Sequence, residues 1–324
     1  AISTTGVHDP IMPFLPDGIH IKVDIDINSD DGRIKVDLRD NPDSVDAGLN
    51  LTEATATMSA AQAVFSCLDS DIPHNSGSFR RLDILLRENC ITGIPRFPHS
   101  CSVATTNMTD TIINTVQAGF AQLGDGFGFS QGNMCNGAGT GVCSGKDWRH
   151  GGAPYVNQMF MSAGGMPASA RNDGMHGMVN PVSAGLVYRD SIEVNEQRFP
   201  FQVESVRALE DSCGAGRRRG GPASEVIMGP RNEPMLVINI SNGLKNVPQG
   251  VLGGLPSQPG VQMKISADGS EEFYSTDAYC HLSPGDRLRA VDNGGGGYGN
   301  PLTREAERVL SDVQERFVSR AQAE

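Results

Sequence analysis

Glycine is the residue type that most constrains how this chain can fold. The sequence of 324 residues contains 39 glycines and 19 prolines, with dense runs at "DSCGAGRRRGGP" (211–222) and "GGGGYGNP" (294–301). Both residue types interrupt regular elements and favour turns. The sequence therefore predicts abundant loops and strand-to-strand turns.

Regular patterning is clearest in the first 123 residues. Apolar and polar residues alternate over 19–38 around the turn "NSDDG", which predicts a β-hairpin. The alanine-rich segment 51–68 predicts a helix, and helical spacing predicts a second one over 109–123. The expected buried faces are Met58, Ala61, Val64, Phe65 and Leu68 in the first helix, and Ile112, Ile113, Val116, Phe120 and Leu123 in the second.

The second half reads differently. Residues 124–180 are glycine-rich without regular periodicity, and a loop region of this length is usually functional or lies between subunits. The tail 303–323 is patterned as an amphipathic helix with Val309, Val313 and Phe317 on one side. Between them, short strands are predicted at 183–194, 199–209, 224–230, 235–241, 261–266 and 286–291.

The expected fold is therefore α+β: an early β-hairpin and two helices, a long glycine-rich loop region, a strand-rich second half and a C-terminal helix. We divide the chain into a hairpin–helix–loop region (1–180) and a strand-rich region (181–324), which together form either two units or one continuous domain.

Charge and cysteine content exclude several classes of protein. The net charge of −12 disfavours a nucleic-acid binder, whose phosphate contacts need a basic face, and also disfavours binding to anionic membranes. Seven cysteines without a C-x-x-C pair favour reduced thiols. With no apolar run long enough to span a bilayer and no signal peptide, we expect a soluble cytoplasmic protein.

Three interpretations of residues 211–222 are open. Glycine amides and arginines suit a phosphate cradle, Cys213 suits a nucleophile, and Asp211 suits the cap of a structural turn. The run lacks the Lys-Ser/Thr ending of a P-loop, and no nearby histidine serves Cys213 as a base, so the structural turn is favoured. For the run 294–301 we favour close backbone approach or subunit packing over nucleotide binding.

The histidines give no complete constellation. None has H-x-x-x-H, H-E-x-x-H or H-x-D spacing, and no Ser-His-Asp order or nucleophile elbow is present. Asp173 and His176 in "RNDGMHG" and His150 in "RHGG" are the polar residues closest to a metal or substrate pattern. For each of them we favour a loop, surface or interface residue that makes hydrogen bonds.

Five patches in order carry a family resemblance: "IPHNSGSFRRLDI" (72–84), "GGMPASARNDGMHG" (164–177), "IEVNEQRFPFQVESVRALEDSCGAGRRRGG" (192–221), "GVLGGLPSQPG" (250–260) and "LSPGDRLRAVDNGGGGYGNPLTR" (282–304). Together they resemble the hydantoinase B family, which includes 5-oxoprolinases and the α-type subunits of ketone carboxylases. Near residue 211 the family pattern is an acidic residue, Ser, glycines and Arg-Gly-Gly. Asp211, Ser212, Gly214, Gly216, Arg219, Gly220 and Gly221 match it, whereas Cys213 stands where glycine is expected.

The resemblance covers residues from about 18 to the end and implies only the C-terminal half of such a subunit. The Asn-Asp-Pro-type segment and His/Asp metal site of the family's N-terminal half have no counterpart here. It implies an ATP-dependent complex with a hydantoinase A-like ATP-binding subunit and a separate N-terminal-half B-type chain. ATP and a divalent metal would be bound by those partners; no metal ligand is assigned to this chain.

The resemblance implies that the complex hydrolyses a cyclic amide such as a hydantoin, 5-oxoproline or lactam. Carboxylation of a ketone is the alternative, and a non-catalytic scaffold for the partner's active site is a third; the isolated chain is expected to be inactive. Candidate catalytic residues are His150, Asp173, His176 and Arg219. Candidate substrate- or partner-binding residues are Asn136, Gly151, Gly152 and Asp211.

Overall fold

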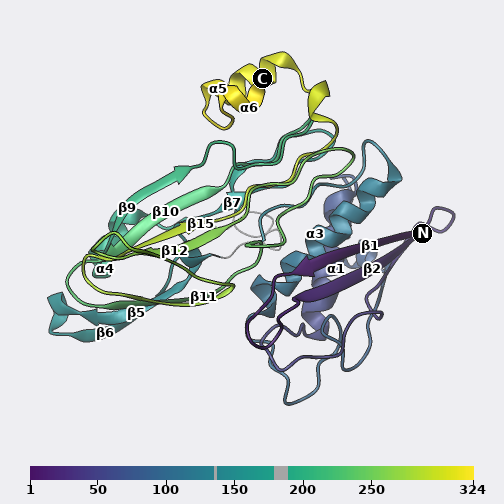
Figure 1. Cartoon of the computed structure of the whole chain (residues 1–324). Helices are drawn as coiled ribbons and strands as arrows, with labels where there is room; N and C mark the ends of the chain where they lie inside the picture. Colours follow the sequence, from purple (N-terminus) through teal and green to yellow (C-terminus); the bar gives the residue numbers. More distant parts are fainter. Residues whose placement is uncertain (135–136, 179–188) are drawn as a thin grey trace.

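The computed structural model describes residues 1–134, 137–178 and 189–324 (Figure 1). Two hydrophobic cores organise these residues. The first is built from side chains between Ile2 and Phe120, and the second from side chains between Ala138 and Ala290. The division at residue 180 remains a prediction.

The first core lies between a four-stranded sheet and two helices. The sheet order is β1-β2-β3-β4, antiparallel except for the parallel β3–β4 pair, and helix α3 packs on β1 and β2 and against α1. In Figure 1 these helices lie along β1 and β2. The elements are β1 (Ile2–His8), β2 (Ile19–Asn28), β3 (Arg33–Asp37), α1 (Glu53–Cys67), α2 (Ser76–Phe79), β4 (Leu82–Leu85) and α3 (Met108–Phe120).

The predicted hairpin is confirmed as β2 and β3, paired from Asp24↔Asp37 to Asn28↔Arg33. Both predicted helices are present, but Met58 and Leu123 were wrongly placed in the core. Met58 is 47% exposed because α1 buries its alanine-rich face instead. Leu123 is 44% exposed because α3 ends at Phe120 and the chain continues as a short 3₁₀ turn, Ala121–Leu123.

The second core lies between two antiparallel sheets. One has the order β13-β12-β15-β10-β9 and the other β14-β11-β5-β6, with a two-stranded β7-β8 ladder beside them. The strands are β5 (Val142–Asp147), β6 (Ala153–Gln158), β7 (Gly164–Gly165), β8 (His176–Met178), β9 (Phe201–Ala208), β10 (Ser224–Pro230), β11 (Met235–Ile240), β12 (Val261–Ile265), β13 (Glu271–Phe273), β14 (Asp277–Leu282) and β15 (Arg287–Val291).

Strands β9, β10, β11, β12 and β15 confirm the five strands predicted from 199 onward. The prediction of continuous loop over 124–180 was wrong, because β5 and β6 form a regular hairpin there. The strand predicted at 183–194 was also wrong where it can be tested. Helix α4 (Ile192–Arg198) begins there, with the Ser191 hydroxyl accepting the Val194 N–H as an N-cap.

The C-terminal tail is helical but not one helix. It forms α5 (Ala306–Gln314) and α6 (Arg320–Ala323), separated by Arg316 in the left-handed region at φ 57°. The Phe317 N–H returns to the Asp312 carbonyl and closes the end of α5. In Figure 1 these helices sit at one edge of the molecule, above the extended glycine-rich segments.

Candidate functional site

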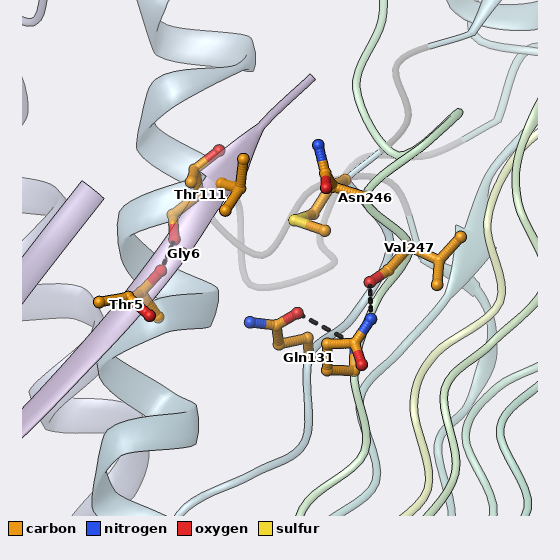
Figure 2. Close-up of a pocket in the computed structure, with 10 residues that line it drawn as sticks. Thr5, Gly6, Thr111, Gln131, Asn246 and Val247 are labelled. Atoms are coloured by element: carbon orange, nitrogen blue, oxygen red, sulfur yellow. Dashed lines mark hydrogen bonds between the residues drawn. The ribbon is translucent and has the colours of Figure 1, made fainter. Parts of the chain in front are cut away.

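A cavity of about 230 Å³ lies where the first core meets the loops of the second (Figure 2). Strand β1 and helix α3 form one side, and the loops around residues 131 and 246 form the other. The lining residues are Thr5, Gly6, Val7, Thr111, Thr115, Gln131, Met134, Asn246, Val247 and Gln249. All of them are uncharged.

Helix α3 supplies the cavity with a buried polar face. It buries Thr109, Asp110, Thr111, Asn114, Thr115 and Gln117. The Thr111 hydroxyl donates to the Asn107 carbonyl and the Thr115 hydroxyl to the Thr111 carbonyl, at 3.2 and 2.6 Å. Because Ser and Thr hydroxyls can bond the carbonyl four residues back, these side chains are tolerated inside a buried helix.

The same helix fixes the loops on the opposite side. The Asn114 Oδ1 accepts the N–H of Gly132 at 2.6 Å, and the Asn242 Nδ2 donates to the Thr111 Oγ1 at 3.2 Å. Strand β1 can lie against α3 because residue 6 is glycine: a Cβ there would overlap the Thr115 Oγ1. Polar side chains of one helix thus set the width of the cavity.

Asp9 anchors the loop that carries Asn246. Its buried carboxylate accepts the N–H groups of Leu244, Lys245 and Asn246 at 2.6, 3.0 and 2.7 Å, and the Asn246 Nδ2 at 2.9 Å. The Asp9 N–H in turn donates to the Asn242 Oδ1 at 2.9 Å. A carboxylate that accepts several backbone N–H groups is a strong local constraint.

His8, the neighbour of Asp9, is fully buried. Its Nδ1 lies 2.9 Å from the Asp9 carbonyl, and its Nε2 lies 3.1 Å from the Asn107 Oδ1. Burial lowers the pKa of His8 and outweighs the opposing effect of these hydrogen bonds. The His8 side chain therefore links β1 to Asn107, the residue that precedes α3.

Two amide side chains present hydrogen-bonding groups to the cavity. Gln131 is 8% exposed; its Oε1 accepts the Gln249 N–H at 3.0 Å, which leaves its Nε2 free to donate. Figure 2 shows the Gln131 side-chain nitrogen turned toward the side of the cavity formed by β1 and α3. The Asn246 Nδ2 is held by Asp9, which leaves its Oδ1 free to accept. The cavity thus combines a fixed donor with a fixed acceptor.

Asp173 and Arg219, two of the predicted catalytic residues, are brought together in a charged cluster with Arg304 and Asp312. Arg304 donates to both carboxylates at 2.7 Å, and the Arg219 Nε donates to Asp312 at 2.7 Å. Burial alone would raise the pKa of Asp173, but bonding to Arg304 and the charges of Arg304 and Arg219 outweigh burial and lower it.

The charged cluster attaches the C-terminal helices to the glycine-rich segments. The Arg219 guanidinium lies 4.7 Å from the centre of the Phe317 ring, and Asp211, at φ 58°, accepts the Ser319 N–H at 2.7 Å. The geometry of Asp173, Arg219 and Asp211 is thus one of internal pairing. Their predicted catalytic and binding roles remain predictions.

Of the two predicted catalytic histidines, His176 is more enclosed than His150. Its Nδ1 lies 3.1 Å from the Pro222 carbonyl and its Nε2 lies 3.4 Å from the Arg189 Nη2. Burial, followed by the charges of Arg189 and Arg219, lowers its pKa. It is not among the residues that line the cavity.

His150, Gly151 and Gly152 form the turn between β5 and β6. The His150 side chain is 70% exposed, and both glycines have positive φ, at 68° and 81°. None of the three lines the cavity, and their predicted substrate or partner contacts remain predictions. Asn136 lies outside the described residues.

The glycine runs pack backbone against backbone. The N–H groups of Gly214, Gly220, Gly221 and Gly295 donate to the carbonyls of Gly295, Gly214, Met166 and Gly221. A Cβ at Gly220 would overlap Gly295, so side chains are excluded there. These amides are engaged with protein carbonyls rather than turned toward an anion, which favours the structural interpretation. Burial raises the pKa of the Cys213 thiol to about 11, and the reactive thiolate is disfavoured.

Sequence analysis missed the residues that build the cavity. Asp9 and Asn246 have no local motif, because they meet only after the chain has folded across more than two hundred positions. The polar residues of α3 were visible at helical spacing, but only the apolar face of that segment was interpreted. Gln131 lies inside the stretch 124–180 that was expected to meet substrate or partner.

No metal centre is found in residues 1–134, 137–178 and 189–324: no group of three or more His, Cys, Asp or Glu side chains could hold an ion there. We assign none of these residues to a metal. Within the same residues, no helix combines the length and apolar character needed to cross a membrane.

Comparison with known proteins agrees with the fold and with the sequence resemblance. The chain is 28% identical over 301 residues to an uncharacterised protein of Methanocaldococcus jannaschii, covering 92% of this chain and 50% of that protein. It is 26% identical over 253 residues to the caprolactamase subunit beta of Pseudomonas jessenii, covering 76% of this chain and 43% of that subunit. An acetone carboxylase structure superposes on 99% of this chain and 48% of its own, with a TM-score of 0.83 at 15% identity.

The chain thus spans about half the length of the curated relatives it matches. The family model described as hydantoinase B/oxoprolinase matches residues 4–301, nearly the whole sequence. The chain belongs to the hydantoinase B/oxoprolinase family.

Proposed function

We propose that this chain acts as a hydantoinase B-type component of an ATP-dependent complex that hydrolyses a cyclic amide. The observation that carries the proposal is the family match over residues 4–301, together with the similarity to a caprolactamase subunit. A hydantoinase A-like subunit would bind ATP, and a chain equivalent to the other half of a B-type subunit would complete the assembly. ATP and any divalent metal would be held by those partners.

The division of labour follows from the chemistry of amides. An amide carbonyl is a poor electrophile, and transfer of the ATP γ-phosphoryl group to its oxygen would make the carbon reactive and release ADP. Water then adds to that carbon, the ring C–N bond breaks, and phosphate leaves. The part of this chain is to hold and orient the ring, and the cavity beside α3 is the candidate place.

Ketone carboxylation is the second candidate. The chain is 24% identical over 317 residues to the acetophenone carboxylase delta subunit of Aromatoleum aromaticum, so the same architecture serves both reactions among relatives. A scaffold without catalytic groups is the third. Within the described residues, the charged candidates Asp173 and Arg219 are paired internally, which supports this third candidate.

The test is to purify the native complex and follow ADP release. We expect ATP consumption to depend on a lactam or hydantoin and to yield the ring-opened acid. Consumption with a ketone and bicarbonate, but not with cyclic amides, would establish the second candidate instead. If the complex turns over neither cyclic amides nor ketones, both proposed reactions are wrong. Native mass spectrometry of the same sample identifies the partners.

A further inference from the structure

We propose that the cavity between β1 and α3 selects a small neutral ring that carries an adjacent carbonyl and N–H, and rejects rings that bear a carboxylate. The inference rests on the proposed function in treating this ring as the substrate. It adds the substrate class: neutral lactams and hydantoins rather than 5-oxoproline.

The first argument is the match of hydrogen-bonding groups. Within the described residues, the Gln131 Nε2 has no hydrogen-bond partner, and the Asn246 Oδ1 is an acceptor whose own amide nitrogen is already held by Asp9. Both side chains lie on the loop side of the cavity in Figure 2. A cyclic amide offers the complementary pair, a carbonyl that accepts and an N–H that donates. Because partners fix each side-chain amide, neither can rotate freely to suit a different pattern.

The second argument is the absence of a cation. None of the lining residues that the structure describes is charged, and the undescribed residues 135–136 and 179–188 contain no Asp, Glu, Lys, Arg or His in the sequence. Lys245, in the adjoining loop, lines a separate hollow with Pro10 and Tyr274. A ligand carboxylate would lose its hydration without gaining a counter-ion.

The third argument is the negative charge of Asp9, which contacts the lining residue Asn246. Asp9 is fully buried, and its carboxylate lies 2.9 Å from the Asn246 Nδ2. An anionic ligand near Asn246 would therefore be repelled by Asp9, while a neutral amide would not. The volume of about 230 Å³ is below the roughly 300–1,000 Å³ of sites for drug-sized ligands, which suits a single ring.

Binding is measured by calorimetry on the native complex without ATP, so that no turnover occurs. The probes are δ-valerolactam and 5-oxoproline, which are both small cyclic amides but differ in charge. We expect the neutral lactam to bind at least about tenfold more tightly. Equal or tighter binding of 5-oxoproline overturns the proposal.

A loss-of-function variant tests the donor. Gln131→Glu keeps an oxygen that can accept the Gln249 N–H but removes the free N–H donor, and we expect about tenfold weaker lactam binding. Gln314→Glu, at an exposed position of α5, makes the same chemical change elsewhere and serves as the control. Unchanged affinity in a folded Gln131→Glu complex contradicts the assigned donor.

A gain-of-function variant keeps the proposal testable even if Gln131→Glu fails to fold. Thr5→Lys places a cation on an exposed lining position, and we expect 5-oxoproline binding to rise about tenfold. Ser3→Lys adds the same charge to the same face of β1 outside the cavity. No gain with Thr5→Lys, or an equal gain with Ser3→Lys, overturns the proposal.

The two proposals fail separately. If ATP-dependent amide turnover is observed but its KM is insensitive to Gln131→Glu, the function stands and the assigned binding site is wrong. If lactams bind with the expected dependence on Gln131 but never stimulate ATP consumption, the site stands and the hydrolase function is wrong.

Discussion

The cavity beside α3 and the charged cluster under the C-terminal helices both contain buried polar side chains, yet they differ in which hydrogen-bonding groups remain unpaired. In the charged cluster, Asp173 and Asp312 are matched by Arg219 and Arg304 at 2.7 Å. In the cavity, no lining side chain is charged, but Gln131 and Asn246 each keep one hydrogen-bonding atom for another molecule. The charged residues are thus paired with one another, whereas each of the two neutral amides has one hydrogen-bonding atom turned to the cavity.

The largest expected effect comes from breaking the charged cluster. Arg304→Met removes the guanidinium shared by Asp173 and Asp312 and leaves two largely buried carboxylates undercompensated, which should cost about 3–5 kcal/mol of unfolding free energy. Urea denaturation measures the loss. Proteolysis should release the tail beyond residue 304 first.

The matched control is Arg320→Met. Arg320, the first residue of α6, pairs with Glu324, which follows the helix, but the two side chains are 87% and 69% exposed. Because exposed ion pairs contribute little, we expect a change within about 0.5 kcal/mol. If Arg304→Met also abolished lactam binding while the fold persisted, the separation between the charged cluster and the cavity would be wrong.

Removing the charge of Asp9 should destabilise the loop on one side of the cavity, with a smaller cost in unfolding free energy than Arg304→Met. Asp9→Asn keeps the size of the side chain but replaces a carboxylate that accepts four N–H groups of residues 244–246, at a cost of about 2 kcal/mol. Hydrogen exchange should become faster at these three backbone amides. Calorimetry should show weaker lactam binding.

Asp17→Asn, at an exposed position in the turn before β2, controls for the change in net charge. It should leave the exchange of residues 244–246 and ligand affinity unchanged. Unaltered protection of those amides in Asp9→Asn would show that the loop is held by its surroundings rather than by the carboxylate.

A region could be predicted from the sequence where the interactions that define it are local. The hairpin β2–β3 and the strands β9, β10, β11, β12 and β15 were predicted because alternation is a local pattern, whereas β13 and β14 were not predicted. The helix α4 was missed because its Ser191 cap lies inside a run that also reads as a strand. Met58 was misplaced because apolar spacing does not reveal which face of a helix is covered, and Leu123 because the spacing does not reveal that α3 ends at Phe120.

The cavity was harder to predict than the fold. Its anchor joins residue 9 to residues 244–246, and no spacing rule connects such distant positions. The groups proposed to bind the ligand belong to Gln131 and Asn246, which no sequence motif marks. They stand out only because one polar atom of each side-chain amide is already bonded within the protein. The charged cluster, in contrast, contains residues that were singled out in advance, and the structure was needed to show that they are paired.

The smallest expected effect is on the pH dependence of stability, to which His8 near the cavity and His176 near the charged cluster should contribute differently. Burial lowers the pKa of His8 beside the cavity and of His176 near the charged cluster, so the folded protein binds fewer protons than the unfolded chain below pH about 6.5. Stability should be constant above that pH and fall as the pH drops, by up to about 1.4 kcal/mol per pH unit for each histidine. The lowered pKa of Asp173 keeps that carboxyl out of this range.

Denaturation at pH 7.5 and 5.5 compares His8→Gln, His176→Gln and His20→Gln. His8→Gln should flatten the pH dependence most because His8 is completely buried, and His176→Gln should flatten it less. His20→Gln, at an exposed position of β2, makes the same substitution outside both regions. If His176→Gln had the larger effect, the imidazole beside the charged cluster would be the more strongly constrained of the two.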